Sequence, residues 1–168
     1  LLEAAVVSPS GRLVATAFSY GKGEKTLRVH DIETGKTLVF PLPRRDPGGR
    51  SGDAAARMGM EDTIQALAFA DEATLYTAGD GGILRWRLPT GSHERVWVTP
   101  PGVFVSAIRL GLDGRTAFVV ELKFGSLDCG SARLLDLASG RAEPVPSIGE
   151  CPVYVAQSGD RTVTAIGS

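Results

Sequence analysis

The chain has 168 residues, the length of one ordinary domain, and its 43% hydrophobic and 22% charged content is typical of a globular protein. Eighteen basic against nineteen acidic residues leave a net charge of −1, so no cationic surplus exists for nucleic acid or an anionic membrane surface. The sequence contains no apolar run long enough for a membrane helix, and two cysteines and two histidines are too few for a disulfide framework or a zinc site. We therefore expect no nucleic-acid partner, no membrane partner, no metal and no cofactor.

The chain repeats itself, and its 21 glycines and 10 prolines predict short strands joined by turns. The first copy, residues 1–40, contains AAVVSPSG, RLVATAF, a Gly-rich turn and KTLRVHDIETGK, with a fourth strand expected at 37–40. The second copy, residues 63–98, contains ALAFADEATLYTAGDGGILRWRLPTG, with a fourth strand expected at 95–98. Residues 103–146 form a third copy, and residues 152–168 begin a fourth. Each copy reads as strand, polar turn, strand, Gly-rich turn, strand and T-G or S-G turn.

One position anchors the repeats near the end of each third strand, where His30, Trp86 and Leu135 are equivalent. A unit of roughly 40–45 residues with four strands is a β-propeller blade. The sequence therefore predicts an all-β fold, a β-propeller of about three and a half four-stranded blades in an incomplete ring. Residues 41–62 are expected to be an inserted loop.

The second copy resembles a WD-repeat blade in its segment 78–86, AGDGGILRW, where an aspartate precedes the strand tryptophan by six residues. The turns 8–12, SPSGR, and 112–115, LDGR, are similar to the family's turn between its first two strands. His30-Asp31 and Leu135-Asp136 stand where the family has Trp-Asp. The resemblance implies structural roles for Asp80, Trp86 and His30: the aspartate accepts hydrogen bonds in its turn, and the tryptophan packs on the neighbouring blade. The family's Gly-His pair is absent from every copy.

Three blades and a half cannot close a ring, because propellers usually need four to eight blades. We expect the chain to be a fragment of a longer propeller, so that its partners include the remaining blades. The alternative is a half-ring completed by another copy or another chain.

The long connections are expected on one face of the blades, because strand direction alternates in an antiparallel sheet. They are residues 19–24, 41–63 and 121–130, and loops on a rigid scaffold usually carry function. The 41–63 segment has balanced charge. Partner-binding candidates in these loops are Arg44, Arg45, Arg50, Met58, Met60 and Phe124. The alternative to partner binding is that the 41–63 segment is a mobile, solvated insertion with one helical turn.

The sequence shows none of the common motifs of nucleotide binding or of serine nucleophiles. The segment 21–26, GKGEKT, lacks the spacing of a phosphate-binding loop, and neither a Gly-x-Ser-x-Gly elbow nor Ser-x-x-Lys occurs. His30 is expected to be half-buried on a strand, and His93 is expected to be exposed in a tight turn. Cys129 and Cys151 are a possible disulfide between adjacent blades, against the alternative of two reduced thiols in a cytoplasmic protein.

Three hypotheses about the function follow from the sequence. The first is a non-catalytic module, a scaffold or sensor of a larger WD-repeat protein, that binds a protein partner. Fourteen arginines against four lysines suggest a bacterial source. The second rests on the first copy, which is also similar to blades of prolyl-oligopeptidase-type serine peptidases, whose propellers gate a hydrolase domain. The third is a purely structural half-propeller inside a larger assembly.

Overall fold

The structure is a computed structural model that describes residues 2–18, 26–42, 63–123, 130–145, 154–157 and 164–167. Side chains are described from residue 4 onward in the first four of these ranges. The described elements are all β-strands, and no helix in this part of the chain is long and apolar enough to cross a membrane.

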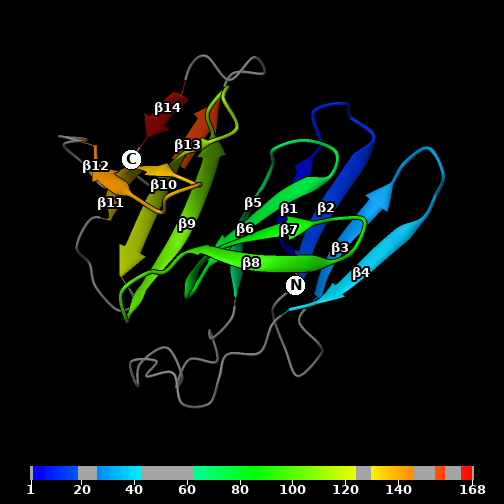
Figure 1. Ribbon diagram of the computed structural model, residues 1–168, viewed down its shortest axis with the longest axis horizontal. Coiled ribbons are helices and arrows are strands. Elements are labelled where there is room, and N and C mark those ends of the chain that lie inside the picture. The colour runs from blue at the N-terminus through cyan, green and yellow to red at the C-terminus, as the bar shows by residue number, and fades with distance from the viewer. Residues whose placement is uncertain are drawn as a thin grey trace.

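Three antiparallel four-stranded sheets and one strand pair make up the described structure (Figure 1). Blade 1 consists of β1 (Leu2–Val7), β2 (Leu13–Phe18), β3 (Thr26–Asp31) and β4 (Thr37–Pro41). Blade 2 consists of β5 (Ile64–Phe69), β6 (Thr74–Gly79), β7 (Gly82–Arg87) and β8 (Ser92–Trp97). Blade 3 consists of β9 (Val103–Leu110), β10 (Thr116–Lys123), β11 (Ser131–Asp136) and β12 (Ala142–Pro144). The pair is β13 (Tyr154–Gln157) with β14 (Thr164–Gly167).

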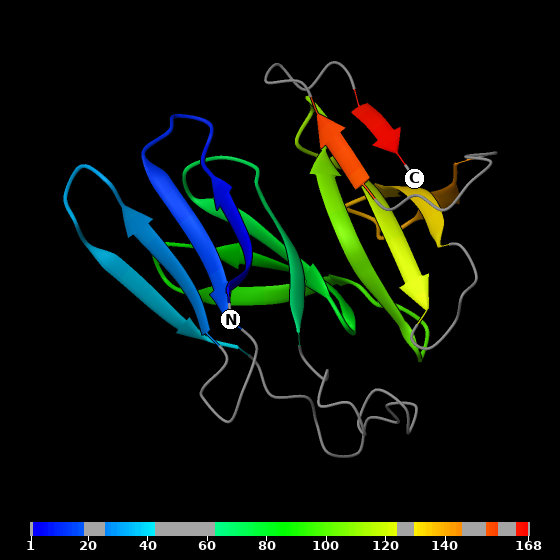
Figure 2. The same cartoon turned by 180° about the vertical axis from the view of Figure 1, so that it is seen from behind.

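The first strands of successive sheets lie side by side. β1 contacts β5, β5 contacts β9, and β9 contacts β13, while β4, β8 and β12 form the outer edges of their sheets. The sheets therefore fan out around the inner strands as propeller blades do, in an arc that is not closed (Figures 1 and 2). The predicted fold class is confirmed.

The hydrophobic core lies between the blades, because alternate residues of each strand point to opposite faces of its sheet. One buried cluster joins blade 1 to blade 2, with Ala15, Leu27 and Val29 against Leu75 and Trp86. A second joins blade 2 to blade 3; its fully buried members are Ile83, Val105, Ile108, Ala117, Val119 and Leu135. Burial at these interfaces stabilises the arc by roughly 25 cal/mol for each Å² of apolar surface removed from water.

The strand registers place the three anchor residues at equivalent points. His30 lies opposite Val14 and Thr37, and Trp86 lies opposite Leu75 and His93. Leu135 lies opposite Ala117 and Ala142. The internal repeat read from the sequence is therefore matched by the pairing of the strands.

The start of the fourth strand in blade 2 differs from the prediction. β8 begins at Ser92 rather than at residue 95, because the amides of Thr90 and Gly91 both donate to the Arg87 carbonyl and close the turn by Gly91. Gly91 takes a φ of 68°, which favours glycine. His93 consequently lies on a strand, and its predicted place in a tight turn is wrong, although its side chain is exposed as expected.

The two ends of the blades differ. The loop face is the end that carries Phe18, Thr26, Leu42, Lys123 and Gly130, the described residues that flank long connections. The turn face is the opposite end, formed by the tight turns 8–12, 32–36, 70–73, 88–91, 111–115 and 137–141. The long connections thus leave from one face, as the alternation of strands predicts.

Candidate functional site

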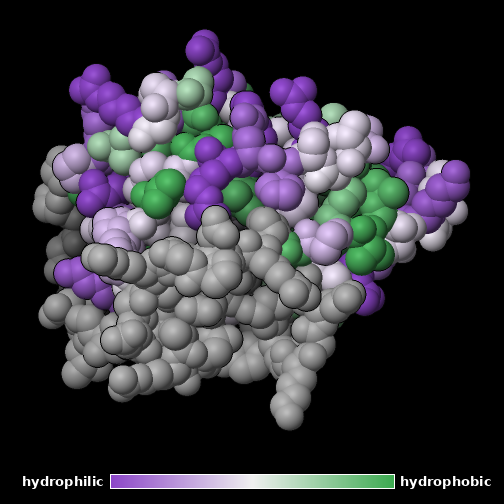
Figure 3. Space-filling view, turned by 60° about the horizontal axis from the view of Figure 1, so that its bottom comes forward, coloured by the Kyte–Doolittle hydropathy of each residue, from purple (hydrophilic) through white to green (hydrophobic). Residues whose placement is uncertain are grey.

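The loop face is the candidate binding surface suggested by the sequence. Its six candidate residues, Arg44, Arg45, Arg50, Met58, Met60 and Phe124, lie outside the described residues. Cys129 and Cys151 also lie outside them, so the possible disulfide stays a prediction. Seen from this side, the described surface mixes hydrophilic and hydrophobic residues (Figure 3).

Asp80 lies on the loop face in the tight connection between β6 and β7. Its amide donates to the Thr63 carbonyl at 3.3 Å, and the residue forms an isolated bridge with Phe104 of the next blade. The flanking glycines are required by space: a Cβ on Gly79 would lie 1.8 Å from the Thr63 carbonyl oxygen, and one on Gly82 would lie 2.1 Å from that of Trp97. The segment therefore holds the backbones of blades 2 and 3 close together.

Trp86 lies in the interface between blades 1 and 2. Its side chain is 1% exposed, and its Nε1–H donates to Thr77 Oγ1 at 3.0 Å. The indole lies 6.0 Å from the Phe40 ring of blade 1 and 4.5 Å from the His93 ring on the adjacent strand. This arrangement closes the outer part of the interface with aromatic surface.

His30 occupies the same position on the open side of blade 1 and is half-buried. Its Nδ1 lies 2.9 Å from Thr37 Oγ1, and its Nε2 lies 3.5 Å from Thr16 Oγ1. Arg28, on the same side of the sheet, places its guanidinium 5.2 Å from the centre of the Phe18 ring. Polar and cationic groups therefore share this face with apolar ones.

An open groove of about 440 Å³ runs along the loop face of blade 3. Its lining includes Pro100, Pro101, Lys123 and a nearly buried carboxylate, that of Glu121. Arg133 Nε donates to Glu121 Oε2 at 2.5 Å, and Ser131 Oγ does so at 3.0 Å. This group was not predicted, because nothing in the local sequence distinguishes a buried glutamate at a strand end from an exposed one.

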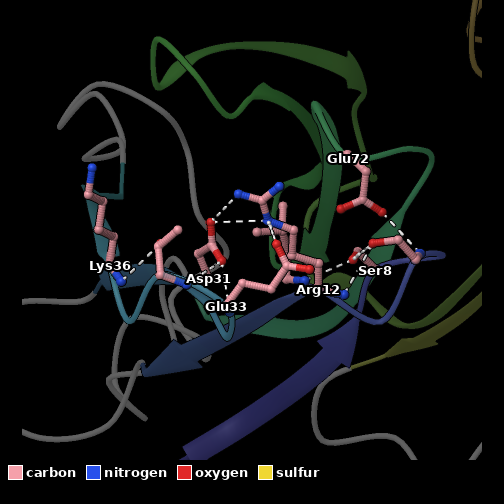
Figure 4. A network of polar contacts seen from close by, with 9 residues as sticks. Ser8, Arg12, Asp31, Glu33, Lys36 and Glu72 are labelled. Atoms are coloured by element: carbon pink, nitrogen blue, oxygen red, sulfur yellow. Dashed lines mark hydrogen bonds and ion pairs between the residues drawn. The ribbon is translucent and has the colours of Figure 1, made fainter.

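The turn face carries ordered carboxylates that the sequence analysis also left out (Figure 4). Asp31 Oδ1 accepts from the amides of Glu33 and Thr34. Its other oxygen accepts from Arg12 at 2.7 Å, and this pairing holds the pKa of Asp31 well below its ordinary value. Asp136 repeats the motif with the amides of Ala138 and Ser139, so the recurrent spacing D-x-x-[TS]-G was the available signal.

Hydrogen bonding joins blade 1 to blade 2 on this face (Figure 4). The Ser10 amide donates to Glu72 Oε1 at 3.1 Å. Desolvation opposes the charge of Glu72, but the hydrogen bonds from Ser10 lower the pKa of its carboxyl. The contact fastens two turns that belong to different sheets.

Among the residues whose side chains are described, no group of three or more histidine, cysteine, aspartate or glutamate side chains is placed to hold a metal ion. The polar groups on both faces are engaged mainly in turns and ion pairs. The described part of the two faces presents a groove, ion pairs and exposed strand residues.

Solved structures match the chain, whereas no protein-family model and no curated protein sequence does. Hydrazine synthase of Kuenenia stuttgartiensis is 18% identical with a TM-score of 0.69, over 98% of this chain and 43% of that one. TolB from Acinetobacter baumannii is 15% identical with a TM-score of 0.60, over 95% and 36%. The tricorn protease is 15% identical with a TM-score of 0.59, over 95% and 14%.

These comparisons support a β-propeller, and identities this low bear on the fold alone. The chain spans less than half the length of each of these three proteins. A WD-repeat assignment in particular rests only on the resemblance of its motifs.

Proposed function

We propose that the chain is a non-catalytic propeller module that binds a protein partner through its loop face. The observation that supports this most is the asymmetry between the ends of the blades: the described strand ends that flank residues 19–25, 43–62 and 124–129 all lie at the same end. A scaffold of β-sheets with its long connections at one end suits recognition. The proposal includes a WD-repeat-like scaffold or sensor role and a cytoplasmic location.

The experiment that tests the proposal compares two variants of the full chain in capture of partners. The loop-face variant replaces Met58, Met60 and Phe124 by serine. The turn-face control is Lys36→Gln. A captured partner is then purified and its affinity is measured by calorimetry. We expect the loop-face variant to lose the partner and the control to keep it; equal binding by both variants contradicts the proposal.

The alternative is a gating propeller of a serine peptidase. It is favoured by the resemblance of blade 1 to such propellers, and a protease is among the matching structures. A fluorophosphonate probe, which labels activated serines, separates the two functions: a labelled partner on the loop face supports gating, and an unlabelled one supports the binding module.

A further inference from the structure

The charge pattern of the turn face breaks in blade 2. In blade 1 the third strand ends in Asp31, whose carboxylate accepts from the side chain of Arg12. The carbonyl of Arg12 accepts in turn from the amide of Ile32, the residue after Asp31. Blade 3 repeats this backbone hydrogen bond after Asp136, with the Arg115 carbonyl as the acceptor. In blade 2 the corresponding hydrogen bond runs from Leu88 to the Ala73 carbonyl, and the strand ends in Arg87.

Blade 2 therefore has alanine at the position of the arginine and arginine at the position of the aspartate. The glycine amide donates to the strand-end carbonyl in all three blades, but in blade 2 the amide and hydroxyl of Thr90 also donate to the Arg87 carbonyl, where the other blades use a carboxylate. The Arg87 side chain is exposed and makes no hydrogen bond or ion pair with the residues that the structure describes. Its charge is not needed for the turn.

Arg87 lines an open groove of about 510 Å³ between blades 2 and 3, which is within the size range of ligand sites. Strand alternation puts Arg85 and Arg87 on the side of β7 opposite Trp86, toward blade 3. The other polar lining residues are Asp71, Thr74, Tyr76 and Thr90, and Gly114 contributes from blade 3. Arg85 is already bound to Glu94, so Arg87 is the available cation.

The corresponding space between blades 1 and 2 is bridged by the hydrogen bond from Ser10 to Glu72. The corresponding turn of blade 3 carries Asp113, but its carboxylate accepts from Arg115 and Thr116 of its own turn. The groove between blades 2 and 3 is therefore left without such a bridge.

We propose that this groove on the turn face is a carboxylate-binding site centred on Arg87, and that it takes the acidic side chain of an extended peptide. A guanidinium offers a planar fork that matches a carboxylate in two hydrogen bonds. Ala70, Ala73 and Pro89 supply apolar wall for a short methylene stem. The carboxylate in the lining, that of Asp71, is engaged in its own turn, because its Oδ1 accepts from the Ala73 amide.

The site is separate from the loop-face proposal, because it lies at the opposite ends of the strands. Calorimetry on the full chain tests it with three probes: acetylated tetraglutamate amide, its tetraglutamine counterpart, and glutarate. The variants are Arg87→Gln, Arg87→Lys and Arg87→Asp, the last of which restores the residue of the other two blades. Lys36→Gln on the turn face of blade 1 is the charge-matched control.

We expect the tetraglutamate peptide to bind, and Arg87→Gln to weaken binding about tenfold or more, with a smaller loss in Arg87→Lys. Arg87→Asp should abolish binding while the chain stays folded, because aspartate caps this turn in blades 1 and 3. Lys36→Gln should change the affinity by no more than about twofold. Binding of glutarate alone would support the carboxylate site with a free dicarboxylate as its ligand.

The proposal is overturned if neither acidic probe binds, or if tetraglutamine binds as well as tetraglutamate. It is also overturned if Arg87→Gln and Lys36→Gln bind equally. A far-ultraviolet circular dichroism spectrum of each variant separates lost binding from lost fold.

Discussion

Trp86 donates its indole N–H to the hydroxyl of Thr77 at 3.0 Å inside the interface of blades 1 and 2. Both residues are almost completely buried, at 1% and 2% exposed. The equivalent pair in blade 1 is His30 and Thr16, 3.5 Å apart on the half-buried open face. Equivalent strand positions in the two blades therefore place an aromatic ring nitrogen beside a threonine hydroxyl. This contact is buried in blade 2 and accessible to water in blade 1.

Replacing Thr77 by valine should lower the free energy of unfolding by about 1–3 kcal/mol, because the buried indole N–H is left without an acceptor. Urea unfolding followed by tryptophan fluorescence measures the loss. Thr16→Val is the matched control and should cost roughly 1 kcal/mol or less, because water can reach His30. Equal losses in the two variants would show that the buried hydrogen bond is not what distinguishes the two positions.

Replacing Gly82 by alanine should destabilise the protein, because the new Cβ would lie 2.1 Å from the Trp97 carbonyl oxygen at a φ of 114°. Backbone has to move, so we expect a loss of about 2 kcal/mol or more in the free energy of unfolding. Gly102→Ala is the control, since it shares a positive φ of 76° but meets nothing within 4 Å. Its loss should be about 1 kcal/mol, and thermal unfolding of both variants checks the order.

The Glu121–Arg133 pair should couple in a double-mutant cycle. Glu121→Ala leaves a partly buried guanidinium without its carboxylate, and we expect a loss of about 1–3 kcal/mol. In the background of Arg133→Met the same change should cost less, because no cation is left unpaired. Urea unfolding of the four proteins gives the coupling, and additive losses would contradict a direct interaction.

The repeat explains why the sequence predicts the fold well. Alternating apolar residues such as those of β2 and β3, together with regularly spaced turns, specify four-stranded units whatever the ring they belong to. The start of β8 was missed because Ser92, His93 and Glu94 look like turn residues, although they lie on an exposed outer strand. Their pairing with β7 is set by the Gly91 turn rather than by hydrophobic pattern.

The polar contacts and grooves at the two ends of the blades were less predictable than the fold, because they depend on how neighbouring strands and blades pack. Ser10 and Glu72 meet only when two sheets pack, and Glu121 becomes buried only against its neighbours. The substitution of Arg87 at an aspartate position was visible in the aligned repeats. Its meaning depends on the groove, which a single sequence does not show.

Acidification should destabilise the chain through its turn carboxylates. Hydrogen bonds from the amides of Ser139 and Ala138 lower the pKa of Asp136 below its ordinary value of 3.8. The amides of Thr116 and Arg115 do the same for the pKa of Asp113. The folded state therefore binds fewer protons than the unfolded state, so the free energy of unfolding is highest above the unfolded pKa and falls as pH drops below about 4.

Asp136→Asn isolates one contribution, because the amide oxygen can still accept from the turn but no longer titrates. We expect this variant to keep most of its stability at neutral pH and to lose less than the native chain between about pH 5 and pH 2. Urea midpoints measured across that range give the two slopes. Parallel slopes would mean that Asp136 has the same pKa in the folded and unfolded chains, and that the acid sensitivity arises from other carboxylates such as Asp31.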